Sequence, residues 1–121
     1  MNIWLASAAL LCAVTSIVHI LLGERDVVRP LLAQQLDEEL KFTLFLCWHI
    51  TTIVLVGMSI ALGLAAFGLA SRDLAWFASI ASLLFAVLNV GVVLRFRLRP
   101  AQFPQWVVFV PIALLGFAGL V

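Results

Sequence analysis

The sequence predicts an all-α integral membrane protein, an up-down bundle of four transmembrane helices with a short amphipathic surface helix between the first and the second. The first observation is composition: 65% of the residues are hydrophobic and 11% are charged, whereas soluble domains carry about 25% charged residues. The second is a set of apolar stretches without Asp, Glu, Lys or Arg, at residues 3–22, 42–69, 74–94 and 103–121. Crossing a hydrocarbon core of about 30 Å takes roughly 20 helical residues. The runs are continuous rather than alternating, which disfavours a β-barrel.

The first apolar stretch, residues 3–22, begins without a basic segment and carries its alanines near the start. A cleaved signal peptide has a basic segment first and small residues after its apolar core, so we expect a retained transmembrane helix. In the interfacial segment that follows, residues 23–41, Pro30 suits the first turn of a helix. Leucines recur there every four residues beside polar side chains, at Leu32, Leu36 and Leu40. This spacing predicts the amphipathic helix on the membrane surface.

The second transmembrane helix, residues 42–69, is longer than a bilayer requires, so we expect it to tilt or to project from the membrane. The third helix covers residues 74–94 and ends in the basic segment RFRLRP, residues 95–100. The fourth covers residues 103–121. Pro111 should bend it, because proline lacks an amide donor and crowds the preceding turn. We expect all 121 residues to form a single transmembrane domain.

Basic residues are distributed unequally between the two faces of the predicted bundle. The face with both termini and the turn 71–73 has one basic side chain, Arg72. The opposite face has six, namely Arg25, Arg29, Lys41, Arg95, Arg97 and Arg99. The positive-inside rule makes that face cytoplasmic, with both termini on the periplasmic side of what we interpret as a bacterial inner membrane. Acidic residues share the cytoplasmic face and the net charge is only +1, which weakens the case for a purely electrostatic lipid or nucleic-acid patch. We expect the lipid bilayer as a partner because of the apolar helices, and no nucleic acid.

Four strong hydrogen-bonding side chains lie at a similar depth near this cytoplasmic face, one from each helix. They are His19, His49, Asn89 and Gln105. At about 1.5 Å of rise per residue, all four lie within roughly 12 Å of the same face. The outer half of the bundle offers only small hydroxyl side chains. We therefore expect a binding site, if the protein has one, at the cytoplasmic end.

Small and polar residues recur on one face of each helix, a pattern typical of helix–helix contacts in lipid. The stripes are Ala8, Cys12, Thr15, Ser16, His19 and Gly23 on the first helix, Ala75, Ser79, Ser82, Ala86 and Asn89 on the third, and Gln105, Phe109, Ile112, Gly116 and Gly119 on the fourth. On the second helix, a similar stripe runs from His49 through Thr52, Val56, Ser59 and Gly63. We expect these faces to point inward. Trp48 would then lie to the side as an interfacial anchor, and Cys12 and Cys47 would be packing residues.

These polar side chains allow a structural and a functional interpretation. In the structural one they hydrogen-bond across helices, and each bond contributes only about 0.6 kcal/mol. In the functional one they bind or transport a small molecule, a lipid or an ion. The site would contain the ligand-binding residues His19, His49, Asn89 and Gln105, with Glu24, Arg25, Lys41 and Arg95 at its rim.

Two histidines at similar depth also allow other hypotheses. His19 and His49 could be axial ligands of haem b in an electron-transfer subunit, with arginines at the cytoplasmic rim near the propionates. A metal site or acid–base catalysis could use both histidines and Glu24. Glu24 lies five residues from His19, however, a poor fit to one helical face, so an enzyme is not favoured. The remaining hypothesis is an accessory subunit in a homo-oligomer or a larger membrane complex.

Overall fold

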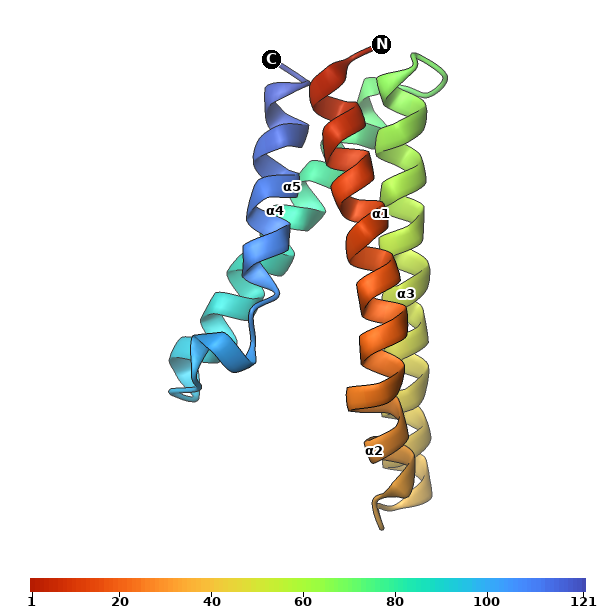
Figure 1. Ribbon diagram of the computed structural model, residues 1–121, viewed down its shortest axis with the longest axis vertical. Helices are drawn as coiled ribbons and strands as arrows, with labels where there is room; N and C mark the ends of the chain where they lie inside the picture. The colour runs from red at the N-terminus through yellow and green to blue at the C-terminus, as the bar shows by residue number, and fades with distance from the viewer.

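The computed structural model covers residues 1–121 and consists of helices joined by short loops, without a strand. The elements are α1 (Ile3–Gly23), the π-helical turn η1 (Glu24–Val28), α2 (Arg29–Ala33), α3 (Glu38–Ala66), α4 (Arg72–Arg95), the 3-10 turn η2 (Pro100–Gln102) and α5 (Trp106–Ala118). They form two antiparallel hairpins, in which α1 and α2 pack on α3, and α4 packs on α5 (Figure 1). Both chain termini lie at the same end. The predicted all-helical bundle is confirmed.

Three helical segments are long and apolar enough to cross a membrane: Ile3–Ala33, Glu38–Ala66 and Arg72–Arg95. The last helix, α5, is apolar but has only 13 residues, or about 20 Å of rise. The sequence predicted a fourth helix over residues 103–121. It is shorter because the chain around Pro100 and Pro104 forms a 3-10 turn and a loop, and proline cannot donate the backbone hydrogen bonds of a regular helix.

The predicted separate surface helix within residues 23–41 is not formed. Instead, helical geometry continues from α1 through η1 into α2, so that Ile3–Ala33 is one helical segment of 31 residues. Gly23 has ordinary helical dihedral angles, φ −68° and ψ −37°, and does not interrupt the helix. In a regular α-helix, Pro30 would crowd the carbonyl four residues earlier. The wider π-helical turn, in which the Arg29 N–H donates to the Glu24 carbonyl, comes directly before it and lets the helix continue.

The half of the bundle nearest the termini, which we call the closed end, is packed through small side chains. The side chains of Ala8, Cys12, Ala75, Ser79 and Ser82 are 0% exposed. The buried serine hydroxyls donate to carbonyls of their own helix, Ser79 to Ala75 at 2.8 Å and Ser82 to Ala78 at 2.9 Å. Their polar groups are thus satisfied while the backbones approach closely. This packing confirms the inward stripes predicted for the first and third helices. On the fourth helix the predicted Phe109, Ile112 and Gly116 are buried, whereas Gln105 is exposed.

Polar contacts close the bundle at the termini. The Asn2 backbone N–H donates to the Ala66 carbonyl of α3 at 2.8 Å, and the Asn2 side-chain amide donates to the Gly119 carbonyl after α5 at 2.6 Å. The Arg72 guanidinium donates to the Leu120 carbonyl. One asparagine at the start of α1 therefore connects the last turn of α3 to the end of α5.

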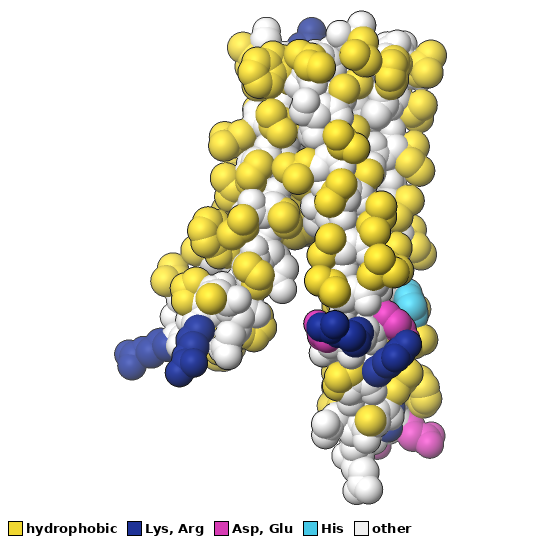
Figure 2. Space-filling model, in the orientation of Figure 1, with side chains coloured by type: hydrophobic (Ala, Val, Ile, Leu, Met, Phe, Trp, Pro, Cys, Tyr) yellow, Lys and Arg dark blue, Asp and Glu magenta, His cyan; other side chains and the backbone are white.

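The other end of the molecule, which we call the open end, has a different shape. There the two hairpins diverge, and the α1–α3 hairpin extends further than the α4–α5 hairpin (Figure 1). Apolar side chains cover most of the visible surface of both hairpins. Basic side chains lie at the tip of the α4–α5 hairpin and, beside acidic ones, along the lower part of the α1–α3 hairpin (Figure 2). Six of the seven basic residues lie at this open end, within residues 24–41 and 95–100.

Candidate functional site

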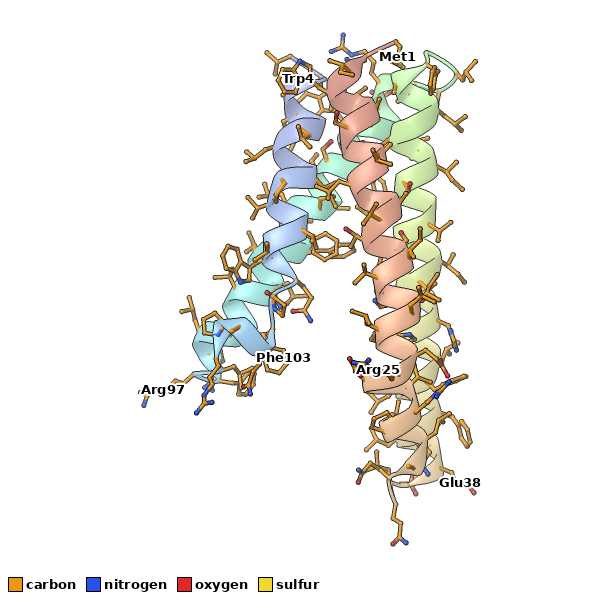
Figure 3. The ribbon with its side chains drawn as sticks, in the orientation of Figure 1. Met1, Trp4, Arg25, Glu38, Arg97 and Phe103 are labelled. Atoms are coloured by element: carbon orange, nitrogen blue, oxygen red, sulfur yellow. The ribbon has the colours of Figure 1, made fainter.

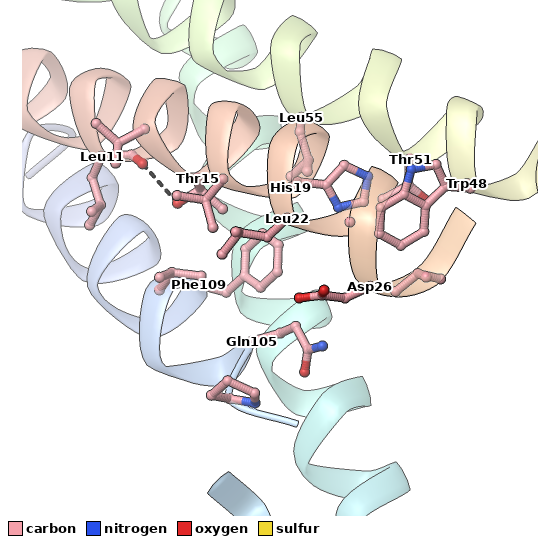
Figure 4. Close-up of a pocket in the computed structure, with 16 residues that line it drawn as sticks. Leu11, Thr15, His19, Leu22, Asp26, Trp48, Thr51, Leu55, Gln105 and Phe109 are labelled. Atoms are coloured by element: carbon pink, nitrogen blue, oxygen red, sulfur yellow. Dashed lines mark hydrogen bonds between the residues drawn. The ribbon is translucent and has the colours of Figure 1, made fainter. Parts of the chain in front are cut away.

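A cleft of about 610 Å³ lies where the two hairpins begin to separate. One wall comes from α1 and η1, a second from α3 and a third from α5 (Figure 4). Its lining is mainly apolar, with Leu11, Val14, Val18, Leu22, Val27, Leu55, Val108 and Phe109 among the lining residues. The polar side chains of the lining are Thr15, His19, Asp26, Trp48, Thr51 and Gln105.

One wall of the cleft is formed by an aromatic stack between α1 and α3. The rings of His19 and Trp48 are stacked with centroids 4.0 Å apart and planes 12° apart. The far edge of the Trp48 ring lies directly on Gly23, so closely that a Cβ at this position would overlap it. The glycine one turn after His19 therefore leaves the space that the tryptophan occupies.

This arrangement reverses the predicted roles of Trp48 and His49. His49 is exposed on the outer side of α3, with its ring edge-on to Phe45 at 4.4 Å, and it does not line the cleft. Neighbouring residues on a helix differ by about 100° in direction, so only one of the two can face α1. The inward face of α3 begins with Trp48 and continues through Leu55, Met58 and Leu62.

The inward face of α3 differs from the predicted one because its residues are large. Leu55, Met58 and Leu62 are 2%, 3% and 0% exposed. They pack against α1, whose buried residues are mostly small, such as Ala8, Ala9 and Cys12. A search for small and polar residues finds the inward face of α1. It misses the inward face of α3, where larger residues pack against the small residues of α1.

The predicted proximity of Asn89 and Gln105 agrees with the structure. The Asn89 side-chain amide donates to the Gln105 side-chain oxygen at 2.8 Å. Its own oxygen accepts from the Trp106 backbone N–H at 3.3 Å. Asn89 of α4 thus caps the first turn of α5, which lacks a side-chain cap from its own N-cap residue. Gln105 then lies at the edge of the cleft.

The predicted rim residues do not converge on the cleft. Glu24 lies 3.8 Å from Arg29 in an exposed ion pair, and Lys41 donates to the Leu32 carbonyl at 3.4 Å. Arg95 lies over the ring of Phe96 at 5.6 Å. Each of these charged side chains contacts a residue of its own hairpin and does not point into the cleft.

Asp26, which the sequence prediction did not include, is the charged residue in the cleft lining. Its carboxylate accepts two hydrogen bonds from Arg25, at 2.6 and 3.1 Å. It follows His19 and Gly23 by seven and three residues, a helical spacing that places all three on one face. The sequence prediction missed this spacing because it ended the first helix before Gly23.

The histidines and cysteines do not form a metal or haem site within the chain. His19 faces Trp48 on the inner side of α3, whereas His49 lies on the outer side of α3, so both cannot ligate one haem. No group of three or more His, Cys, Asp or Glu side chains is arranged to hold a metal ion. Cys12 is a buried packing residue as predicted, and its thiol donates to the Leu55 carbonyl at 3.5 Å. Cys47 was also predicted to pack inside the bundle but is exposed on α3.

One polar atom in the cleft wall has no partner in the protein. The Nε2 atom of His19 is buried and has no hydrogen-bond partner, whereas buried polar groups in proteins are nearly always hydrogen-bonded. Because this atom has almost no accessible surface, it is closed off from the cleft as well, and the cleft provides an apolar lining with an amide and a carboxylate at its edge. Such a surface suits a molecule that is largely apolar and carries a small polar group.

The sequence matches no protein-family model, no curated protein and no solved structure. The functional interpretation of this chain therefore depends on the cleft and on the distribution of charge around it.

Proposed function

We propose that the chain is an integral membrane protein whose cleft binds a membrane lipid or a lipid-like small molecule from the cytoplasmic side. In this proposal all four helices cross a bacterial inner membrane with both termini on the periplasmic side. The unequal distribution of basic residues supports this orientation. The short helix α5 can be accommodated by a local thinning of the bilayer.

The observation that carries the proposal is the apolar lining of the cleft at the end where the hairpins separate. Its volume of about 610 Å³ falls within the range of about 300–1,000 Å³ typical of small-molecule pockets. An ion would need several charged or carbonyl ligands. The charged residue of the lining, Asp26, is already bonded to Arg25. An acyl chain or another apolar group fits this lining better than an ion.

Binding is favoured over conduction because the cleft is closed toward the termini. Beyond Leu55 and Phe109, the core residues Met58, Leu62 and Ile112 are 3% exposed or less. Transport across the membrane would require a second copy or a partner to complete a path, as in the predicted homo-oligomer or larger membrane complex. An electron-transfer role with His19 and His49 on one haem is not supported within a single chain.

Filling the cleft tests this proposal. Val108 lines the cleft and Val107, its neighbour on α5, does not. Val108→Trp should therefore occupy part of the cleft, and Val107→Trp is a matched control with the same change in size. Both proteins would be purified in a mild detergent, and the lipid that remains bound would be identified and counted by native mass spectrometry.

We expect the wild type and Val107→Trp to retain a tightly bound lipid that Val108→Trp has lost. A circular-dichroism melt of each variant checks that the bundle remains folded. Equal lipid retention by the two tryptophan variants would contradict the proposed cleft site.

A further inference from the structure

The two hairpin tips at the open end differ in the sign and pairing of their charges. The α1–α3 tip mixes acidic and basic residues, with Glu24, Asp26, Asp37, Glu38 and Glu39 beside Arg25, Arg29 and Lys41. The α4–α5 tip has three arginines at alternate positions, Arg95, Arg97 and Arg99, and residues 74–121 contain no acidic residue. Figure 3 shows Arg97 at the outermost part of the α4–α5 hairpin.

Every basic side chain of the α1–α3 tip has a partner within the protein. Arg25 is bonded to Asp26 at 2.6 Å, and Arg29 lies 3.8 Å from Glu24. Lys41 donates to the Leu32 carbonyl at 3.4 Å. The positive charges of this tip are therefore largely compensated before any external molecule approaches.

The arginines of the α4–α5 tip have no such partners. Neither an ion pair nor a side-chain hydrogen bond links Arg95, Arg97 or Arg99 to the rest of the protein. All three are exposed, and the Arg95 guanidinium lies 5.6 Å from the centre of the Phe96 ring. Phe96 is itself 65% exposed. This tip presents three uncompensated guanidinium groups together with an exposed aromatic ring.

The backbone at Arg97 provides a second, independent observation. α3 and α4 end in the same way: the Leu69 N–H bonds to the Leu64 carbonyl at 2.8 Å, and the Leu98 N–H bonds to the Val93 carbonyl at 2.9 Å. Each termination places one residue in the left-handed region, Gly68 at φ 72° and Arg97 at φ 51°.

Glycine adopts this left-handed conformation freely, whereas a long side chain rarely does. An arginine occupies a position where glycine would favour the same turn, and its side chain makes no hydrogen bond or ion pair within the protein. This suggests that the guanidinium group of Arg97 is needed for an external partner.

We propose that the arginine turn, residues 95–99, binds the headgroups of anionic phospholipids at the cytoplasmic surface of the membrane. A guanidinium group matches a phosphate with two parallel hydrogen bonds, and anionic lipids attract basic segments next to transmembrane helices. Phe96 and Leu98 alternate with the arginines and suit the boundary between headgroups and acyl chains. The proposal rests on the membrane orientation given above but does not depend on the cleft.

Lipid titrations of the full-length protein in detergent micelles test this proposal. Phosphatidylglycerol and phosphatidylcholine with identical acyl chains would be compared, so that any contribution from the cleft cancels. The test variant replaces Arg95, Arg97 and Arg99 by glutamine. The matched control replaces Arg25, Arg29 and Lys41 by glutamine, which also removes three positive charges at the open end. Native mass spectrometry would measure the bound fraction of each lipid.

We expect the wild type and the control to prefer phosphatidylglycerol, and the test variant to lose about tenfold or more of that preference. The preference should also decrease as salt is added. No preference in the wild type, or an equal loss in both triple variants, would overturn the proposal, because the effect would then be absent or depend on net charge alone.

Arg97→Gly separates binding from folding. Glycine suits the left-handed position, so this variant should melt at the same temperature as the wild type or higher, yet bind phosphatidylglycerol less selectively. Full selectivity in Arg97→Gly would exclude Arg97 from the site and overturn the argument from its backbone. Val108→Trp, which fills the cleft, should keep the headgroup preference. That variant distinguishes a failure of the arginine turn from a failure of the cleft.

Discussion

The closed end and the open end contain the same helices but are held together by different kinds of contact. At the closed end, small residues let the backbones approach, as where Gly116 of α5 lies directly on Ser79 of α4. At the open end, the contact between α1 and α3 is made by the rings of His19 and Trp48, and α5 lies on the far side of a cleft. Close backbone packing leaves no space for a ligand. Helices that diverge and contact each other through large side chains leave a cleft between them.

The comparison assigns different roles to the glycines of the two ends. At Gly116, an added Cβ would meet the side chain of Ser79, including the Cβ of that serine at 3.0 Å, which cannot move without the helix. At Gly23, an added Cβ would meet the far edge of the Trp48 ring, which can rotate away. A substitution that adds a side chain at the closed end should therefore lower stability strongly, whereas the open end should accommodate one by moving a side chain.

The largest expected effect is that of Gly116→Ala at the closed end. The added methyl group should force α4 and α5 apart and lower the free energy of unfolding by about 2–3 kcal/mol, as overpacking does in other cores. Reversible unfolding by denaturant in detergent micelles measures the difference. Gly91→Ala is the control, because Gly91 lies in α4 with nothing within 4 Å of an added Cβ. It should be neutral or stabilise by up to about 1 kcal/mol.

A second substitution tests the cause of the Gly116→Ala effect. Ser79→Ala removes the hydroxyl nearest to the added methyl group but keeps the serine Cβ at 3.0 Å, so it should restore part of the lost stability in the double variant. Additive effects of the two substitutions would show that the helices do not meet at this point.

Asn2→Ala should have the next largest effect. It removes the side-chain bond to the Gly119 carbonyl and the cap for the Trp4 and Leu5 amides, so we expect a loss of about 1–2 kcal/mol. Asn2→Ser keeps an N-capping oxygen but is too short to reach α5. Hydrogen exchange should therefore be faster at the ends of both α1 and α5 in Asn2→Ala, and only near the end of α5 in Asn2→Ser. Unchanged exchange near Gly119 in both variants would contradict the bridging role.

Gly23→Ala at the open end should cost about 1 kcal/mol, because Trp48 would turn away and lose its stack with His19. The loss should be smaller than that for Gly116→Ala, and tryptophan fluorescence should change as Trp48 moves. Trp48→Leu provides the control, since Gly23→Ala in that background should have little effect. An equal cost of Gly23→Ala with and without Trp48 would contradict the proposed contact.

The sequence predicted much of the closed end, because the side chains that allow helices to approach closely are small and their helical spacing is visible in the sequence. Ala8, Cys12, Ser79 and Ser82 lie in the predicted stripes and are fully buried. On α3 the same criterion selected His49 instead of Trp48, since the buried face of α3 supplies the larger residues.

The open end was predicted less well, for two physical reasons. The continuation of the first helix depends on the π-helical turn before Pro30, which a leucine spacing does not reveal, and so Asp26 was not placed beside His19. The divergence of the two hairpins depends on how well the side chains of one hairpin pack against those of the other. A residue pattern within one helix does not contain this information. The depth of His19, Asn89 and Gln105 nevertheless indicated the end of the molecule where the cleft lies.

Asn89→Ala is the smallest expected effect and concerns the edge of the cleft. It removes the bond to Gln105 and the cap on the Trp106 amide, and bonds of this kind between helices in a membrane contribute about 0.6 kcal/mol on average. The global free energy of unfolding should therefore change little, while hydrogen exchange at the first turn of α5 becomes faster. Gln105→Ala, which leaves the cap on Trp106 in place, should not accelerate that exchange. If Asn89→Ala lowers stability as much as Gly116→Ala does, the open end is as tightly packed as the closed end, and the distinction between a rigid closed end and an adaptable binding end is wrong.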